Sequence, residues 1–280
     1  MIRNKKSFAL LFAPAFALTD VLLRKLAVIP LRSLPIGTYW YRRLAIQITC
    51  VVIACLLMLA AKKTFILREK GRPFPTYWIP VCVLMLYSAT RAAGGFLLTK
   101  ASLRPLPEIL ACCVTVLLVG VSEEIVHRGV ILNQLSAAFG NDTMKGRLIS
   151  VFTGGTIFGA IHLFNILSGV DPLSALFQAL GAAGMGWLLG ALYLRCRNIR
   201  VMALIHGLFD LCGLVKSGFF DADETVESTI SSASDILHAD LLTALISEGV
   251  LLLLLAAAAA VMLRNSAMQT SAPAAMQDET

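Results

Sequence analysis

The sequence has 280 residues, of which 58% are hydrophobic and 15% are charged, and its mean hydropathy is +0.78. A soluble domain is about 45–50% apolar, so this composition predicts a protein that crosses a membrane several times. The net charge of +7 does not indicate nucleic-acid binding, because Lys and Arg stand in short clusters between apolar runs, as membrane-surface anchors do. The seven Cys show neither a CxxC pair nor a zinc-site spacing, which favours small buried side chains.

Eight apolar runs are about long enough to span a bilayer, which takes roughly 20 helical residues. They cover residues 7–23, 44–61, 78–98, 108–139, 148–167, 173–194, 199–215 and 237–263. The expected fold is therefore an all-α transmembrane bundle of about eight helices. The predicted division is an N-terminal part with membrane segments of about three helices (1–104), a core region (105–217), and an acidic loop with a last helix and a polar, disordered tail (218–280).

Two of these runs depart from a simple span. The first contains Pro14 and Asp20, and we expect it to be a retained membrane segment, because no convincing signal-peptide cleavage site follows it. The fourth run, at about 1.5 Å per residue, is longer than a bilayer is thick. It is therefore expected to be tilted, kinked or partly outside the membrane.

Basic residues predict the orientation of the bundle. Arg195, Arg197 and Arg200 mark the inside of the membrane, and the acidic loop 216–235 marks the outside. Eight spans then place both termini inside. The first connection contradicts the rule, because five basic residues in or near it would lie outside: Arg24, Lys25, Arg32, Arg42 and Arg43.

The fourth run carries three charged residues at costly positions, Glu123, Glu124 and Arg128. A charged side chain at the centre of a membrane helix costs about 2.5–3.5 kcal/mol, so these residues must face a protein interior or a water-filled cavity. Glu124 and Arg128 are four residues apart and share a helical face, whereas Glu123 projects about 100° away. One acid is therefore expected to be structural and the other free to react.

Three more polar residues lie in later membrane segments. His162 lies in the fifth apolar run (148–167). His206 and Asp210 form a pair on one face of the seventh run (199–215). A lone histidine in a membrane helix is more often a packing residue that hydrogen-bonds to a neighbouring helix. That explanation would have to hold on three helices at once, which favours a shared site.

These groups fit hydrolysis. A carboxylate in a partly dehydrated cavity can take a proton from water, an imidazole can orient that water, and a second histidine can donate to the resulting oxyanion. Glu123, His162 and His206 could instead bind zinc, since two His and a carboxylate make an open catalytic site. The chain has no His-Glu-x-x-His motif, so no cofactor is predicted as required and zinc is the alternative.

Three motifs together resemble those of the CPBP family of intramembrane proteases. Glu-Glu-x-x-x-Arg begins at residue 123, Phe-x-x-x-His at residue 158 and His-x-x-x-Asp at residue 206. That family contains the type II CAAX prenyl endopeptidases and bacterial proteins of bacteriocin processing and self-immunity. The similarity spans about residues 105–215. Each motif alone is weak, but the three at these separations are specific.

The resemblance implies roles for the first two motifs. Glu123 would be the general base, and His162 would hold the attacking water together with it. Glu124 and Arg128 would form an intrahelical pair that fixes the helix and the site. Phe158, the first residue of the second motif, would support this arrangement.

The third motif departs from the family pattern. The resemblance implies that His206 and the residue four positions later form the oxyanion hole, but family members often carry Asn where this chain has Asp210. An ionised Asp cannot donate a hydrogen bond to an oxyanion. It must be protonated, orient His206 or serve another role. Family members were long described as metalloproteases, and the resemblance is equally compatible with a metal-free mechanism that depends on glutamate.

Two polar residues and two glycine pairs receive other assignments. Asn165 is expected to support the site or cap its helix. Arg91, inside the third run, is predicted to be the structural partner of Asp20 or Glu108, and binding of a substrate carboxylate is the alternative. The glycines at 154–155 and at 184 and 186 predict close helix approach.

The sequence therefore predicts an intramembrane endopeptidase. Its partners would be membrane lipid and a peptide or membrane-anchored protein substrate, which could be prenylated or could carry a leader or sorting signal. A bacterial inner membrane is the expected location. One alternative is a non-catalytic immunity or scaffold protein with a structural polar cluster. Another is a proton-coupled transporter with Glu123, His162 and Asp210 as a relay, although the motifs show no internal repeat.

Overall fold

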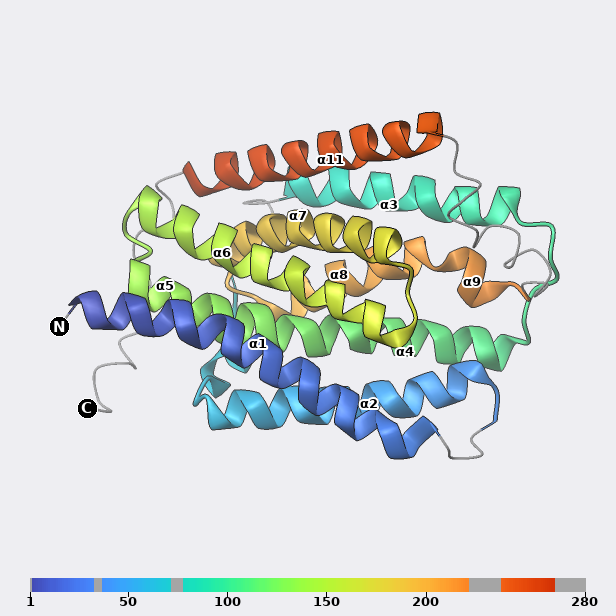
Figure 1. The fold of residues 1–280 in the computed structure, drawn as a ribbon, viewed down its shortest axis with the longest axis horizontal. Coiled ribbons are helices and arrows are strands. Elements are labelled where there is room, and N and C mark those ends of the chain that lie inside the picture. Colours follow the sequence, from blue (N-terminus) through green and yellow to red (C-terminus); the bar gives the residue numbers. More distant parts are fainter. Residues whose placement is uncertain (1, 33–36, 72–77, 222–237, 265–280) are drawn as a thin grey trace.

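The structure is a computed structural model that describes residues 2–32, 37–71, 78–221 and 238–264. Helices α1 and α2 lie along one side of an elongated bundle and α3 and α11 along the other, with the remaining long helices between them (Figure 1). In chain order the elements are α1 (Ile2–Arg32), α2 (Tyr39–Ala60), the 3-10 helix η1 (Thr64–Leu67), α3 (Trp78–Leu98), α4 (Leu106–Glu124), the π-helix η3 (Ile125–Leu132), α5 (Asn133–Phe139), α6 (Met144–His162), the 3-10 helix η4 (Leu163–Ser168), α7 (Pro172–Cys196), α8 (Ile199–Gly213), α9 (Val215–Phe219) and α11 (His238–Arg264).

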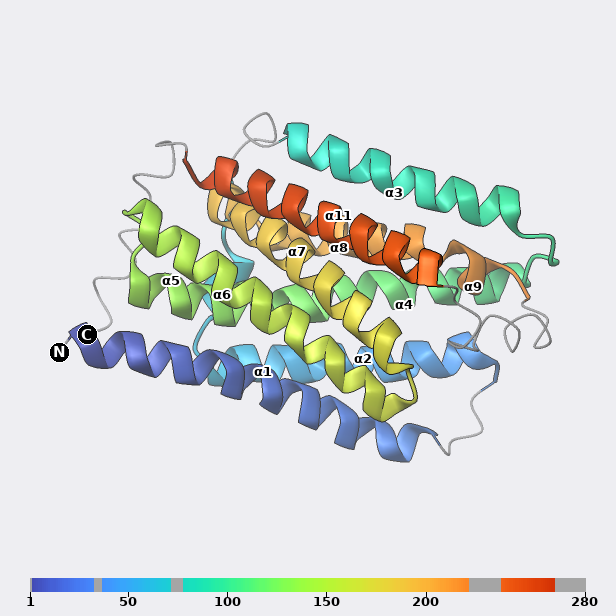
Figure 2. The ribbon, with the colours of Figure 1, turned by 45° about the horizontal axis from the view of Figure 1, so that its top comes forward.

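The described helices confirm the predicted membrane bundle. Helices α3, α8 and α11 run alongside the longer apolar helices (Figure 2). Helix α1 extends well beyond the predicted span 7–23 and includes Pro14 and Pro30. Such prolines are tolerated in membrane helices because neighbouring groups satisfy the freed backbone atoms. Five described helices are long and apolar enough to cross a membrane: Lys5–Leu31, Tyr39–Ala60, Leu106–Phe139, Met144–Ser168 and Pro172–Cys196.

Helix α7 lies in the core of the bundle. Its residues Leu189 and Leu192 are 0% exposed, as expected for a helix that is apolar on every face. Helix α6 packs tightly against it through glycine: a Cβ atom on Gly155 would lie 2.7 Å from the backbone nitrogen of Trp187. The predicted close approach of these helices is therefore confirmed.

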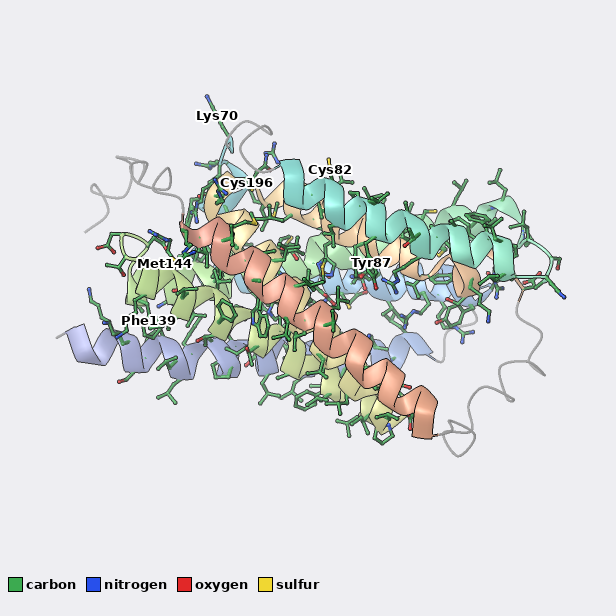
Figure 3. All side chains as sticks on the ribbon, turned by 90° about the horizontal axis from the view of Figure 1, so that it is seen from above. Lys70, Cys82, Tyr87, Phe139, Met144 and Cys196 are labelled. Carbon is green, nitrogen blue, oxygen red and sulfur yellow. The ribbon has the colours of Figure 1, made fainter. Side chains whose placement is uncertain are left out.

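The two ends of the bundle differ in charge. Figure 3 shows Lys70, Phe139, Met144 and Cys196 towards one end, which we call the basic end. Helix α11 also finishes there, since Nε of Arg147 near the start of α6 donates to the carbonyl oxygen of Leu263 at 3.1 Å. Basic residues in and beside the connections at this end include Lys62, Lys63, Arg68, Lys70, Lys145, Arg195, Arg197 and Arg200.

At the opposite end Arg104 pairs with Asp221 at 3.0 Å. The described starts of α1 and α2 lie at different ends (Figure 1), so Arg42 and Arg43 lie away from the basic end, as the eight-span arrangement expects. The side of the membrane that each end faces stays a prediction. Most of the acidic loop 216–235, and the tail 265–280, lie outside the described residues.

The fourth predicted segment is one helix from Leu106 to Phe139 with a π-helical turn inside it. Turn η3 begins directly after Glu124, and all eight of its residues are buried. A π-helix replaces i→i+4 backbone bonds by i→i+5 bonds and occurs frequently at functional sites. The predicted overlong helix thus contains a specific irregularity next to its charged motif.

The predicted partners of Arg91 are wrong. Asp20 accepts a hydrogen bond from Nε of Arg24 at 2.8 Å, and Glu108 lies 3.6 Å from Arg104. Both acids pair with a basic residue four positions away on or beside the same helix, which requires no particular tertiary arrangement. The Arg91 guanidinium instead stacks on an aromatic ring of α8.

Candidate intramembrane active site

His206, on α8, is 4% exposed, and its imidazole lies against the charged motif at the end of α4. Its Nδ1 is 2.7 Å from Oε1 of Glu124, and the same oxygen lies 2.7 Å from Nη1 of Arg128. The side chains of Glu124 and Arg128 are 0% and 2% exposed. The intrahelical pair is therefore present, and its carboxylate also binds His206.

Glycines bring α4 and α8 into this contact. A Cβ atom on Gly120 would lie 2.5 Å from the carbonyl oxygen of Ala203, and one on Gly207 would lie 2.9 Å from Cα of Leu117. Both distances are too short for any side chain, so the two backbones touch only because both positions are Gly. This approach brings the α8 imidazole within reach of the α4 carboxylates.

The second ring nitrogen of His206 faces two further carboxylates. Nε2 lies 3.7 Å from Oε2 of Glu123 and 3.5 Å from Oδ2 of Asp210. These separations exceed a direct hydrogen bond of about 2.7–3.2 Å. The side chain of Glu123 is 22% exposed, whereas that of Glu124 is fully buried. Glu123 is thus the partly exposed glutamate of the motif.

Phe158, on α6, is the packing centre of the site and is 2% exposed. Its ring meets the imidazoles of His127, His162 and His206 edge to face, at centroid distances of 4.7, 4.9 and 5.7 Å. The guanidinium carbon of Arg128 lies 4.9 Å from the same centroid. One aromatic side chain therefore spaces three histidines and covers the buried cation.

His162 ends α6, and its ring is oriented by the backbone. Nδ1 lies 2.8 Å from the carbonyl oxygen of Phe158, a contact in which an Nδ1 proton donates to the carbonyl. In the neutral ring Nε2 then keeps a lone pair and can accept a hydrogen bond. No hydrogen bond or ion pair joins His162 to Glu123 in the described part of the chain.

Two other polar residues have positions that the sequence did not specify. Nδ2 of Asn165 donates to Oε1 of Gln178 on α7 at 2.8 Å, so its side chain is engaged with α7. His127 is 3% exposed, and neither of its ring nitrogens has a hydrogen-bond partner among the described residues. Its ring packs on Phe158 instead.

The predicted zinc ligands do not form a metal-binding group. Within the described ranges, no three His, Cys, Asp or Glu side chains are grouped as metal ligands. In particular, Nδ1 of His206 is engaged by Glu124, and no hydrogen bond or ion pair joins His162 to Glu123 among the described residues. The donor set of Glu123, His162 and His206 therefore does not fit a preformed zinc site.

Sequence reasoning missed the contact between the first two helices and the charged motif. Nη1 and Nη2 of Arg24 lie 3.0 Å and 3.3 Å from Oγ and the carbonyl oxygen of Ser122, the residue before Glu123. Gln47 on α2 donates to the same Oγ at 2.9 Å. Asp20, 3% exposed, holds Arg24 in place. The i,i+4 spacing of Asp20 and Arg24 within an apolar run was the available signal.

The fold and the site define a polytopic helical membrane protein whose core holds carboxylates and histidines close to one another. Residues 105–212 match a protein family described as type II CAAX prenyl endopeptidase Rce1-like. The match confirms that this region resembles the CPBP proteases, and the Rce1-like family is a protease family. No curated protein and no solved structure gave a significant match.

Proposed function

We propose that the protein is an intramembrane endopeptidase in which Glu123 activates water to attack a peptide bond. The observation that carries this proposal is the placement of His206, whose Nδ1 is bound by buried Glu124 while Nε2 faces Glu123 and Asp210. A water-accessible carboxylate opposite a fixed imidazole provides a general base and an oxyanion donor. The Rce1-like match of residues 105–212 supports peptide-bond hydrolysis.

Glu123 acts first as a base and then as an acid. It takes one proton from water while the water oxygen bonds to the carbonyl carbon, and the carbonyl oxygen becomes an oxyanion. His162 accepts the second water hydrogen at Nε2 and so holds the nucleophile, because its Nδ1 donates to Phe158. The carbon–nitrogen bond then breaks, and Glu123 passes its proton to the leaving amine.

His206 is the oxyanion donor in its doubly protonated form. Its Nδ1 proton donates to Glu124 at 2.7 Å, and its Nε2 proton points into the space beside Glu123. The imidazolium charge lies among three carboxylates, so it needs no further counter-ion. A substrate oxygen that enters this space receives the Nε2–H bond as its negative charge develops.

Asp210 orients His206 in this proposal. An ionised carboxylate cannot donate to an oxyanion, so Asp210 does not replace the Asn that family members often carry. Its Oδ2 lies 3.5 Å from Nε2 on the same helical face, where it attracts the Nε2 proton before substrate enters. In this proposal Asp210 therefore has a different role from the Asn of the family pattern, and His206 remains the donor to the oxyanion.

The substrate class follows from the family and the location of the site. The matched family is one of CAAX prenyl endopeptidases, so a lipidated, membrane-anchored carboxyl-terminal segment is the first class to test. Peptide leaders and membrane-anchored sorting signals are the second class. The proposed location is a bacterial inner membrane.

The test is cleavage of a peptide library by the purified protein in lipid nanodiscs. The library contains lipidated carboxyl termini and leader-type sequences. We expect wild type to cleave, and Glu123→Gln or His162→Ala to lower turnover by about 10²–10⁴-fold, the usual contribution of acid–base catalysis. Glu108→Gln, which removes another α4 carboxylate at the helix start, should cleave as wild type does.

Cleavage by these variants, chelation and genetic complementation together separate the alternatives. Cleavage that survives in both Glu123→Gln and His162→Ala would contradict this mechanism. If a chelator removes the activity and zinc restores it, the zinc-dependent mechanism would be favoured. Full complementation of a deletion strain by Glu123→Gln would favour the non-catalytic immunity or scaffold protein.

A further inference from the structure

A second group of polar side chains lies between the candidate site and the basic end of the bundle. We call it the η3 clamp, and it consists of Glu69, Asn133, Tyr193 and Arg197. None of these residues takes part in the proposed reaction. They surround the junction of η3 and α5, where the π-helical turn returns to an α-helix.

Asn133 closes the π-helical turn. Its Nδ2 lies 3.1 Å from the carbonyl oxygen of Arg128 and 2.9 Å from that of Gly129. Where i→i+5 bonding gives way to i→i+4 bonding, backbone carbonyls lose their regular partners, and a buried carbonyl without a partner is costly. The Asn133 amide supplies those partners. One of the two carbonyls belongs to the residue whose guanidinium binds Glu124.

Helix α7 and the loop after η1 hold Asn133 in turn. Its Nδ2 donates to Oη of Tyr193 at 3.0 Å, and its Oδ1 accepts from Nη1 of Arg197 at 3.0 Å. Glu69 completes the ring by accepting from Oη of Tyr193 at 3.0 Å and from Nε of Arg197 at 3.0 Å. Tyr193 is 0% exposed and Asn133 is 8% exposed, so these bonds replace water that cannot reach them.

Backbone geometry indicates that the clamp is under constraint. Arg197 ends α7 with φ of 48°, a left-handed conformation that non-glycine residues adopt at a cost. In this conformation its guanidinium reaches both Glu69 and Asn133. The strained residue is therefore the one that links the loop after η1 to the π-helical turn.

The 3-10 helix η1, just before this loop, packs directly against η3. Ile66, in η1, is 1% exposed, and a Cβ atom on Gly129 would lie 2.3 Å from its Cδ1. Ile66 and Glu69 both lie outside the family-matched residues 105–212. A short segment of the N-terminal half thus contacts η3 through packing at Gly129 and through hydrogen bonds at Asn133.

We propose that the η3 clamp fixes the π-helical turn and thereby positions the candidate site. The chain of contacts runs from the clamp to the Arg128 backbone, from the Arg128 guanidinium to Glu124, and from Glu124 to Nδ1 of His206. The clamp residues are positioning residues, since they touch neither the water nor the peptide bond of the proposed reaction. The activity part of the test rests on the proposed function, whereas the spectroscopic part does not.

The experiment compares Asn133→Ala with Ser136→Ala in nanodiscs. Ser136 lies one turn further along α5 and is 3% exposed, and its Oγ has no hydrogen-bond partner in the described structure, which makes it a matched control. The imidazole ¹⁵N signals of His206, assigned with a His206→Gln variant, report its hydrogen bond to Glu124. We expect Asn133→Ala to shift these signals and Ser136→Ala to leave them unchanged.

Kinetics provide the second measurement. A misplacement of about 1 Å can lower turnover about 100-fold, so Asn133→Ala should lower kcat by about 10- to 100-fold with KM nearly unchanged. Asn133→Asp keeps the acceptor for Arg197 but loses the amide donors to η3. It should therefore resemble Asn133→Ala. Wild-type kinetics in Asn133→Asp would contradict the capping role.

A variant that removes a single atom keeps the proposal testable if Asn133→Ala does not fold. Tyr193→Phe retains the ring and removes only Oη, which bonds both Asn133 and Glu69. It should shift the His206 signals in the direction that Asn133→Ala does. A folded Tyr193→Phe protein with lower stability but unchanged His206 signals would overturn the proposal and leave the clamp a purely stabilising network. The spectroscopic measurement tests the clamp even if the wild-type protein cleaves none of the peptides.

Discussion

The fully buried carboxylate of Glu124 binds both the guanidinium of Arg128 and the imidazole of His206. Its Oε1 lies 2.7 Å from both Arg128 and His206. Glu124→Gln would leave the Arg128 guanidinium buried and unpaired, and breaking a buried ion pair costs about 3–5 kcal/mol. We expect the free energy of unfolding in lipid to fall by that amount and cleavage to be lost. Denaturant titration followed by circular dichroism would measure the change in stability.

A double variant separates the charge effect from a general loss of packing. Adding Arg128→Met to Glu124→Gln removes the orphaned charge and keeps an apolar side chain against Phe158. We expect the double variant to be more stable than Glu124→Gln alone. Equal stability of the two proteins would show that the ion pair is not what Glu124 contributes.

Asp210 allows the oxyanion assignment to be tested at one position. In the proposed site the carboxylate orients His206, and an amide at this position could donate to the oxyanion directly. Asp210→Asn should therefore retain cleavage, whereas Asp210→Leu should lower turnover by about 10-fold or more, within the range seen when one oxyanion donor is impaired. Steady-state kinetics of the two variants would measure this difference in turnover. Equal activity of the two variants would remove Asp210 from the site.

At the level of helices, the contact between α6 and α7 depends on Gly155. A Cβ atom there would lie 2.7 Å from the backbone nitrogen of Trp187, which cannot move independently of α7, whereas one on Gly154 would lie 3.5 Å from Leu135. Gly155→Ala should lower the free energy of unfolding by at least about 1–3 kcal/mol. Gly154→Ala should be neutral or slightly stabilising, because Ala favours helix more than Gly does. Thermal unfolding of the two variants in one detergent would test this difference.

The helices themselves were predictable, because each apolar run is long enough to indicate a membrane helix without information from the rest of the chain. Helix α3 has its predicted bounds, Trp78–Leu98. The π-helical turn was not predictable, since residues 125–132 have the composition of an ordinary buried helix. The turn is indicated instead by its tertiary contacts. The Asn133 amide lies on the carbonyl oxygens of Arg128 and Gly129, and Ile66 packs against Gly129. Those contacts join segments far apart in the sequence.

The candidate site was predictable only in part, for the same reason. Spacing along one helix indicated the Glu124–Arg128 pair, which the structure contains. The bond from Glu124 to His206 depends on how closely α4 approaches α8, and no property of either helix alone sets that distance. The prediction for Arg91 is wrong for the opposite reason, because Asp20 and Glu108 each pair with a basic residue four positions away along the chain.

For the molecule as a whole, the distribution of charge predicts which end faces the cytoplasm. Lys145 is exposed at the basic end, and Asp221, whose side chain is 52% exposed, lies at the opposite end. The positive-inside rule places the basic end in the cytoplasm. In a cysteine-free background, Asp221→Cys should react with a membrane-impermeant maleimide in intact cells. Lys145→Cys should react only after permeabilisation, and the reverse pattern would invert the topology.

The contact between Arg24 and Ser122 bears on how far the family-matched region is a module. Residues 105–212 carry the candidate site, yet α1 and α2 supply the side chains that bind the residue before Glu123, and the loop after α2 supports η3. Transplanting the matched segment alone into another membrane scaffold would carry the motifs without these supports. The boundary drawn by sequence similarity is therefore narrower than the boundary of the functional unit. A chimera of this protein would need to exchange α1, α2 and the core together.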